Sequence, residues 1–393
     1  MLLTLALLAA PAHAKSWCAT PLVVHEWGVQ VFDARGQAQA GVPLPPWFYT
    51  LPPNPTEVAE PVRGLPPDNG ERALPVLQFY AGRSYGSPVA VEVGFTQGQA
   101  SAWYPQVDRY TPARVANGPE AAERRAALLT ARAEQGDLQS IFERSQGENP
   151  LLPPDPTRQL AWDALALTPE SDHGQPLPTD VPWVQQLREV EGALWVQQGE
   201  AMERFLFYEA ETSESPAVRI ERIEDGREGH VKVVNTSDWP IYDVFVVTNK
   251  NEQRSVFYAP AIPAGRSAGF LLSEHTLDDP AAWLRTRLLE RDDPLSRYSS
   301  MMGDGECVMG RDPAVPVERA EGHGLYDAEI DVLLDVWGER FFEQPGTTVV
   351  YRESTVSLDA LMPLSIYTDM TRFVVLNRTG LVLWEGLDLD PAP

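Results

Sequence analysis

His25, Glu26 and His323 are the side chains of this sequence that could carry metal chemistry. Imidazole and carboxylate groups bind divalent metals, and a carboxylate beside a metal can also act as a general base. His323 lies between two glycines, which allow the backbone to approach a site closely. With both histidines as ligands and Glu26 as ligand or base, these residues predict a metal-assisted hydrolase as one alternative.

A structural role for His25 and Glu26 explains the same residues without a metal. The sequence contains no HExxH motif. Adjacent side chains of a strand point to opposite faces, so His25 and Glu26 can share one metal only where the strand bulges. Buried histidines and glutamates commonly hold segments together by hydrogen bonds. The G-x-S-x-G pattern at 265–269 precedes a strand-like run instead of a helix, so we expect a turn there and no nucleophile elbow.

Aromatic residues in a proline-rich stretch form a second candidate site. Trp47, Phe48 and Tyr49 follow Pro45 and Pro46. Aromatic side chains on a surface can stack on a glycan or a peptide, although most such residues pack in a core. We therefore expect either a ligand-stacking surface for a protein, peptide or glycan of the cell envelope, or a buried aromatic cluster.

The net charge of −25 excludes several kinds of partner. A negative field of this size repels phosphate backbones, so we expect no nucleic-acid partner. The sequence has neither a Walker A motif nor a G-x-G-x-x-G loop, which disfavours nucleotide cofactors. Hydrophobic residues make up 43% of the chain, enough for a packed core.

The first 14 residues resemble a secretory signal peptide. They contain an apolar run that is too short to cross a bilayer as a helix, and they end in Ala-His-Ala, a small-x-small cleavage pattern. We therefore expect an exported, periplasmic or extracellular protein without a transmembrane segment. Cys18 and Cys307, the two cysteines, would form one disulfide in an oxidising compartment. The alternative is two buried free thiols.

Hydrophobic periodicity predicts a β-rich α+β protein with antiparallel sheets. Residues 15–212 are expected to form a β domain that begins with a central strand at 21–32, and a helical insertion interrupts it at about 112–200. Within the insertion, helices are expected at 119–136 and 179–192, and a loop at 148–178.

Five short strand-like runs at intervals of about 8–12 residues predict an immunoglobulin-like β-sandwich at 213–273. Residues 274–393 are expected to form an α/β segment that packs on the N-terminal domain. Its helices are predicted at 279–291 and 325–342, and a strand is predicted at 371–384.

The chain also resembles a family of exported bacterial proteins identified by an HEWGTFT-type motif near the N-terminus. The opening motif is Val24-His25-Glu26-Trp27-Gly28, after which Val29-Gln30-Val31 replaces Thr-Phe-Thr. Further matching motifs are Leu74-Pro75-Val76, Phe79-Tyr80, Trp103-Tyr104-Pro105, Arg204 to Tyr208, Gly324-Leu325-Tyr326 and Leu361-Met362-Pro363-Leu364. The resemblance implies export and a shared architecture, and it names no reaction. The sequence therefore predicts an extracytoplasmic binding or envelope-structural protein, with the metal-assisted hydrolase as the alternative.

Overall fold

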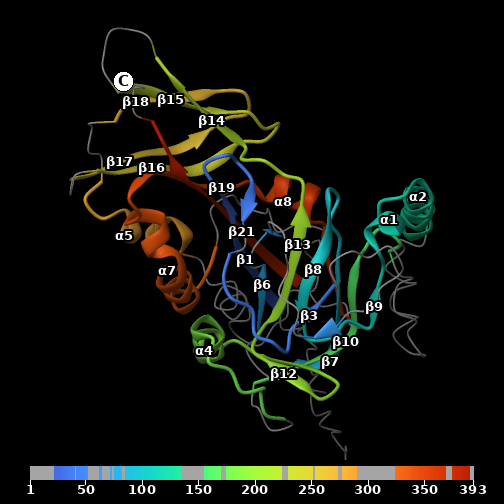
Figure 1. The fold of residues 1–393 in the computed structure, drawn as a ribbon. Coiled ribbons are helices and arrows are strands. Elements are labelled where there is room, and N and C mark those ends of the chain that lie inside the picture. The colour runs from blue at the N-terminus through green and yellow to red at the C-terminus, as the bar shows by residue number, and fades with distance from the viewer. Residues whose placement is uncertain are drawn as a thin grey trace, which may run out of the picture.

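The computed structural model in Figure 1 describes most of the chain. The described residues are 22–39, 41–51, 62–63, 71–72, 75–81, 85–134, 155–169, 174–223, 229–250, 253–272, 277–289, 324–368 and 374–389. Cys18, Cys307 and His323 lie outside these ranges, so the disulfide and one predicted metal ligand stay predictions.

A 12-stranded sheet among the described residues forms the centre of the fold. Its strand order is β17-β16-β19-β21-β1-β6-β13-β8-β3-β4, with β2 paired to β1 and β5 paired to β13. The strands are β1 (Leu22–Phe32), β2 (Ala38–Gln39), β3 (Tyr49–Thr50), β4 (Val62–Arg63), β5 (Glu71–Arg72), β6 (Val76–Tyr80), β8 (Gly98–Tyr104), β13 (Leu206–Thr212), β16 (Ile241–Lys250), β17 (Gln253–Ile262), β19 (Gly346–Glu353) and β21 (Val374–Leu387).

Strand β1 lies in the interior of this sheet, as its apolar, β-branched sequence predicts. It pairs in parallel with β21 and antiparallel with β6. Ten of its eleven residues are buried, which requires cover on both faces of the sheet. Odd-numbered side chains such as Val23 and Trp27 belong to one core, and even-numbered ones such as Leu22 and Val24 belong to another.

Helices cover the odd-numbered face of β1. They are α4 (Pro182–Glu189), α5 (Pro280–Leu288) and α7 (Asp327–Phe342). On α7 the buried residues Ile330, Leu333, Trp337 and Phe341 face the sheet, as the 3.6-residue periodicity predicts. The three helices therefore form one layer on this face, on the left and below the centre in Figure 1.

Two smaller sheets cover the opposite face. The six-stranded sheet has the order β12-β11-β10-β7-β20 with β9 on β10, and the three-stranded sheet has the order β14-β15-β18. Both pack on even-numbered residues of β1, at different ends of the large sheet. Their strands are β7 (Tyr85–Val93), β9 (Arg109–Tyr110), β10 (Leu160–Thr168), β11 (Trp195–Gln198), β12 (Ala201–Glu203), β20 (Leu364–Thr368), β14 (Val218–Arg222), β15 (His230–Asn235) and β18 (Ser267–Leu271).

The expected immunoglobulin-like sandwich at 213–273 is not confirmed as a separate module. All five of its expected strands form, and β14, β15 and β18 do pack on β16 and β17. However, β16 also pairs with β19 and thereby continues into the large sheet. The edge of β16 that does not pair with β17 forms its hydrogen bonds with β19, a strand nearly 100 residues later. Local spacing of strands does not predict that pairing.

The expected helical insertion is only partly helical. It contains α1 (Ala113–Ala116), α2 (Pro119–Glu134) and α4, but β10 occupies 160–168, where we expected a loop. The run Leu160 to Thr168 is mostly buried because β7 and β11 pair on its two sides. Prolines on either side of this segment led us to predict a loop. That prediction is wrong because prolines can flank a strand as readily as they occur within a loop.

Another described helix, α8 (Thr355–Leu361), lies on the same face as the two smaller sheets. The buried Ser354 hydroxyl caps it by accepting a hydrogen bond from the Ser357 amide at 3.1 Å. Among the described helices, none is long and apolar enough to span a membrane.

Candidate functional site

His25 and Glu26 point to opposite faces of β1 and have separate partners. The register between β1 and β21 is continuous through both residues. His25 therefore faces the helical layer, and Glu26 faces the layer that contains the six-stranded sheet and α8. The two side chains do not converge on one point, as regular strand geometry requires.

His25 is fully buried in a polar cluster between β1 and α7. Its Nδ1 lies 2.7 Å from Glu329 Oε2, and its Nε2 lies 3.2 Å from the amide nitrogen of Asn377. A neutral imidazole satisfies both contacts when Nδ1 donates to the carboxylate and Nε2 accepts from the amide. The rings of Tyr80 and Tyr326 lie 5.1 and 4.6 Å from the imidazole centroid.

Glu329 links this cluster to the start of α7. Its Oε2 also accepts a hydrogen bond from the backbone amide of Tyr326 at 2.7 Å, which satisfies one of the amides left open at the helix N-terminus. Burial and the nearby charge of Glu329 raise the pKa of Tyr80 well above its usual value. Glu329 Oε1 and both polar atoms of the Gln78 amide have no hydrogen-bond partner among the described residues.

Glu26 belongs to a second buried cluster, on the other face. Its carboxylate accepts two hydrogen bonds from Arg378, the neighbouring residue on β21, and one from the hydroxyl of Tyr208 on β13. Burial and the charge of Glu26 raise the pKa of Tyr208 well above its usual value. The Arg378 side chain is fully buried, and its Nη1 donates to Asp359 Oδ1 on α8 at 2.9 Å. This cluster ties α8 to the two central strands.

Asp359, which contacts the buried Arg378, also lines an open cleft, which we call the α2–α8 cleft. The cleft has a volume of about 350 Å³ and lies between the α1–α2 region and the end of α8. Ala122 and Arg125 of α2, Thr157, Arg158, Asp359 and Pro363 are among its lining residues. A cleft of this volume is within the range that takes small-molecule ligands.

Asp155 holds the two cleft arginines. Its Oδ2 accepts a hydrogen bond from Arg125 Nε at 2.9 Å and lies 3.6 Å from Arg158 Nη2. Its Oδ1 accepts from the Thr157 amide and hydroxyl, at 2.9 and 2.6 Å. Burial alone would raise the pKa of Asp155, but these hydrogen bonds and the two arginine charges hold it below its usual value.

The predicted aromatic site is largely part of the core. Phe48 is 1% exposed and stacks on Tyr104 with ring centroids 5.4 Å apart. Trp47 is half-buried, packs edge-on against Tyr104, and donates its indole N–H to the Pro178 carbonyl at 3.3 Å. Phe48 therefore has no free ring face for a ligand, and stacking by Trp47 or Tyr49 stays a prediction.

Sequence reasoning missed the partners of both buried clusters, although the sequence carried signals for two of them. Glu329 lies four and eight residues before Leu333 and Trp337, so it is a carboxylate on the apolar stripe of its helix. Arg378 is a charged residue within a long apolar strand. A charge in such a position is normally paired. Arg158 lies in a loop and Asp359 lies on the short helix α8, and no comparable pattern marks them.

Metal-binding geometry is absent from the described part of the chain. No group of three or more histidine, cysteine, aspartate or glutamate side chains there is arranged to hold a metal ion. In comparisons with known proteins, no family model and no curated protein matches this sequence.

Proposed function

We propose that this chain is an exported binding protein whose ligand site is the α2–α8 cleft. The observation that carries the proposal is the contrast between buried and accessible charges. Inside the fold, Glu26 pairs with Arg378, and the buried Glu329 contacts the ring of His25. Arg125 and Asp359 are paired with Asp155 and Arg378, but each leaves about a third of its side chain exposed at a cleft of small-molecule size.

The rigid surroundings of the cleft also support a binding role. Thr96 docks on the end of α8 through hydrogen bonds to the carbonyls of Ala360 and Leu361. The Asn117 amide donates to the Phe95 carbonyl at 3.0 Å and fixes the α1–α2 region on the same loop. A site held in this way loses little conformational entropy when a ligand binds. The leader-like segment at residues 1–14 supports export.

A cleft-filling substitution tests this proposal. Thermal unfolding of the wild-type protein is measured with a panel of amino acids, dipeptides, sugars and organic acids. A ligand at one hundred times its Kd stabilises the folded state by about 2.7 kcal/mol, and so raises the Tm measurably. Ala122→Trp places an indole in the cleft, and we expect it to abolish the shift.

Ala127→Trp is the matched control, because Ala127 is exposed on the same helix and does not line the cleft. It should keep the ligand-induced shift. A ligand that stabilises Ala122→Trp as strongly as the wild type binds elsewhere, and that result would overturn the proposal. So would the absence of any stabilising ligand across the panel.

A metal-assisted hydrolase at His25 is the second proposal, and one observation favours it. Glu329 Oε1 and both Gln78 amide atoms are buried beside His25 and have no hydrogen-bond partner within the described ranges, and buried polar atoms of this kind require a water, an ion or another group. The test is the metal content of chelator-free protein, compared with a His25→Gln variant. One equivalent of metal that is lost in the variant supports a metal site, and metal-free wild type contradicts it.

A further inference from the structure

The α2–α8 cleft carries a positive group at its base. Arg125 and Arg158 share the single carboxylate of Asp155, so these three residues have a net charge of +1. The neighbouring carboxylate, Glu92, shares Arg109 with Asp163, at 3.0 and 2.7 Å, so the charge of Glu92 is only partly balanced. In a protein with a net charge of −25, two arginines at one cleft are a specific feature of that surface.

Arg158 is held in place by hydrogen bonds, but one of its N–H groups has no acceptor among the described residues. Its side chain is 4% exposed, and its Nη atoms donate to the hydroxyls of Thr157 and Ser365 at 3.2 and 3.1 Å. Its Nε has no hydrogen-bond partner among the described residues. A guanidinium has five N–H donors and stays protonated in proteins, so a buried one that is partly satisfied favours an additional anionic acceptor.

Arg125 supplies accessible donors beside it. Only its Nε contacts Asp155, and 37% of its side chain is exposed. Its terminal nitrogens, which have no partner within the described segments, are therefore available to a carboxylate, for which the planar guanidinium is the preferred partner.

Asp359 gives the same cleft a negative group. It lies near the end of α8, and 34% of its side chain is exposed. Arg378 fixes one of its oxygens from inside the fold at 2.9 Å. The lining therefore contains both a cationic and an anionic group, from α2 with its neighbouring loop and from α8 respectively.

We infer that the cleft binds a small zwitterion, an amino acid or a dipeptide, with its carboxylate at Arg125 and Arg158 and its ammonium group at Asp359. This inference rests on the proposed function and names the ligand class of the same site. An amino acid carries both charges on one residue. A dipeptide carries them on two residues whose Cα atoms lie about 3.8 Å apart, so the distance between the charges differs between the two ligands. The charge of Asp359 would repel a simple anion, and the charges of the two arginines would repel a simple cation.

Titration calorimetry of the full-length mature protein tests the ligand class. The probes are the standard L-amino acids and L-alanyl-L-alanine, followed by the N-acetylated and amidated forms of the best binder. Acetylation removes the ammonium charge, and amidation removes the carboxylate. We expect each capped form to bind about 10- to 100-fold more weakly, the usual effect of losing a charged hydrogen-bonding group.

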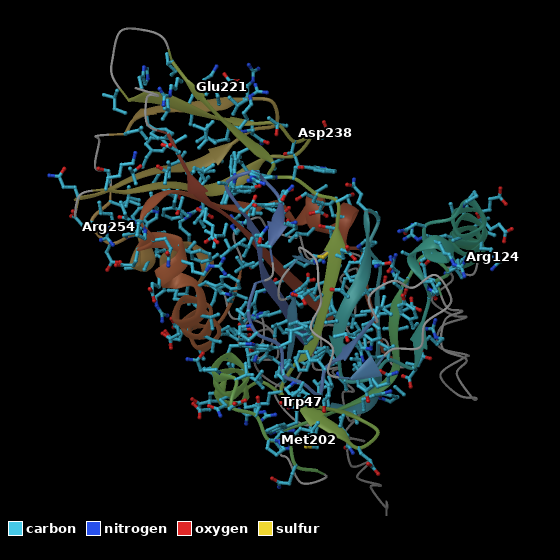
Figure 2. All side chains as sticks on the ribbon, viewed as in Figure 1. Trp47, Arg124, Met202, Glu221, Asp238 and Arg254 are labelled. Carbon is cyan, nitrogen blue, oxygen red and sulfur yellow. The ribbon has the colours of Figure 1, made fainter. Side chains whose placement is uncertain are left out.

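Two variants assign the ends of the ligand. Arg125→Gln should weaken the free and the acetylated ligand about tenfold or more and leave the amidated ligand unchanged. Asp359→Asn should weaken the free and the amidated ligand and leave the acetylated ligand unchanged. Arg124→Gln is the matched control, because Arg124 precedes Arg125 on α2, is 68% exposed, and lies on the outer side of the helix (Figure 2). It should bind every probe as the wild type does.

The outcomes separate this inference from the proposed function. If capped forms bind as tightly as the free ligand, or if the only ligand excluded by Ala122→Trp is a neutral sugar, the zwitterion assignment is wrong and the cleft remains the binding site. If Ala122→Trp excludes no ligand at all, the proposed function itself is overturned. Binding of the free zwitterion that Arg125→Gln leaves unchanged also contradicts the assignment.

Discussion

At the scale of single residues, the Glu26–Arg378 pair is the contact whose loss should cost most stability. Both side chains are almost completely buried. Glu26→Gln leaves the Arg378 guanidinium with half of its negative partners, and breaking a buried ion pair in this way costs about 3–5 kcal/mol. We expect urea unfolding to show a decrease of that size in the free energy of unfolding. Tyr208→Phe, which removes only the hydroxyl donated to Glu26, should cost about 1.5–3 kcal/mol.

Glu120→Gln is the control for this prediction. Glu120 is 83% exposed and pairs with Arg124 one helical turn later. Exposed pairs of this kind contribute about 0.3–0.5 kcal/mol, so the substitution should hardly change stability. Equal decreases in the free energy of unfolding for Glu26→Gln and Glu120→Gln would show that the buried pair contributes no more to stability than an exposed pair does.

Part of this residue-scale picture could be predicted from the sequence. His25 and Glu26 stand out by type, and strand geometry predicts that they face opposite ways. Their partners Glu329 and Arg378 lie more than 300 residues away along the chain. The two pairs depend on α7 and β21 lying against β1, and local sequence spacing does not predict such tertiary contacts.

At the scale of elements, the position of α8 against β21 should decide the geometry of the cleft. A Cβ on Gly380 would lie 2.7 Å from Leu358 Cδ2 on α8 and 3.1 Å from Glu353 Oε2. Gly380→Ala therefore has to displace the buried Leu358 side chain of α8, with an expected loss of about 1–3 kcal/mol for overpacking. Because α8 carries Asp359, we also expect weaker ligand binding in calorimetry, although Gly380 does not line the cleft.

Gly338→Ala should have the opposite effect on stability. Gly338 lies inside α7, and the nearest atom to an added Cβ is Leu334 Cβ at 4.0 Å. Alanine is favoured over glycine within a helix by about 0.5–1 kcal/mol, so this variant should be more stable and bind normally. A stable Gly380→Ala with unchanged binding would show that α8 does not set the cleft geometry.

Helices proved easier to predict than the pairing of strands. The helices α2, α5 and α7 lie within a few residues of the ranges that periodicity and capping patterns indicate. A helix satisfies its backbone hydrogen bonds within one segment, so its pattern is local. Strand β10 was missed because its hydrogen bonds depend on β7 and β11, which are distant in sequence.

At the scale of the whole molecule, packing between the layers should make stability sensitive to alkaline pH. Tyr110 on β9 stacks on Trp103 of the large sheet at 5.5 Å, and burial raises the pKa of Tyr110 to about 12. The unfolded chain releases this proton near pH 10. The stabilisation is therefore complete below about pH 10 and is lost as the pH rises toward 12.

Urea unfolding at several pH values between 8 and 12 checks this prediction. The free energy of unfolding should fall across the alkaline range, and Tyr110→Phe should remove part of that fall. Tyr208 ionises with a pKa that burial raises well above its usual value, so it contributes to the remainder. A Tyr110→Phe variant with the same pH profile as the wild type would contradict a link between Tyr110 and alkaline unfolding.

The arrangement of layers could be predicted only as a class. Composition and strand patterns correctly indicate a β-rich protein with antiparallel sheets and a few helices. They also suggested a self-contained sandwich at 213–273, whereas β16 and β17 form one end of the 12-stranded sheet. Each β-strand pattern reports that one face is buried, and it does not report which strand lies alongside.

The central claim is that the α2–α8 cleft binds a small ligand, and a crystal structure of the complex tests it most directly. The protein would be crystallised with the ligand that gives the largest increase in Tm. We expect its electron density between α2 and α8, within hydrogen-bond distance of Arg125 and Asp359. Density at another surface, such as the exposed Trp283 on α5 or the half-buried Trp47, with an empty cleft, would contradict the claim.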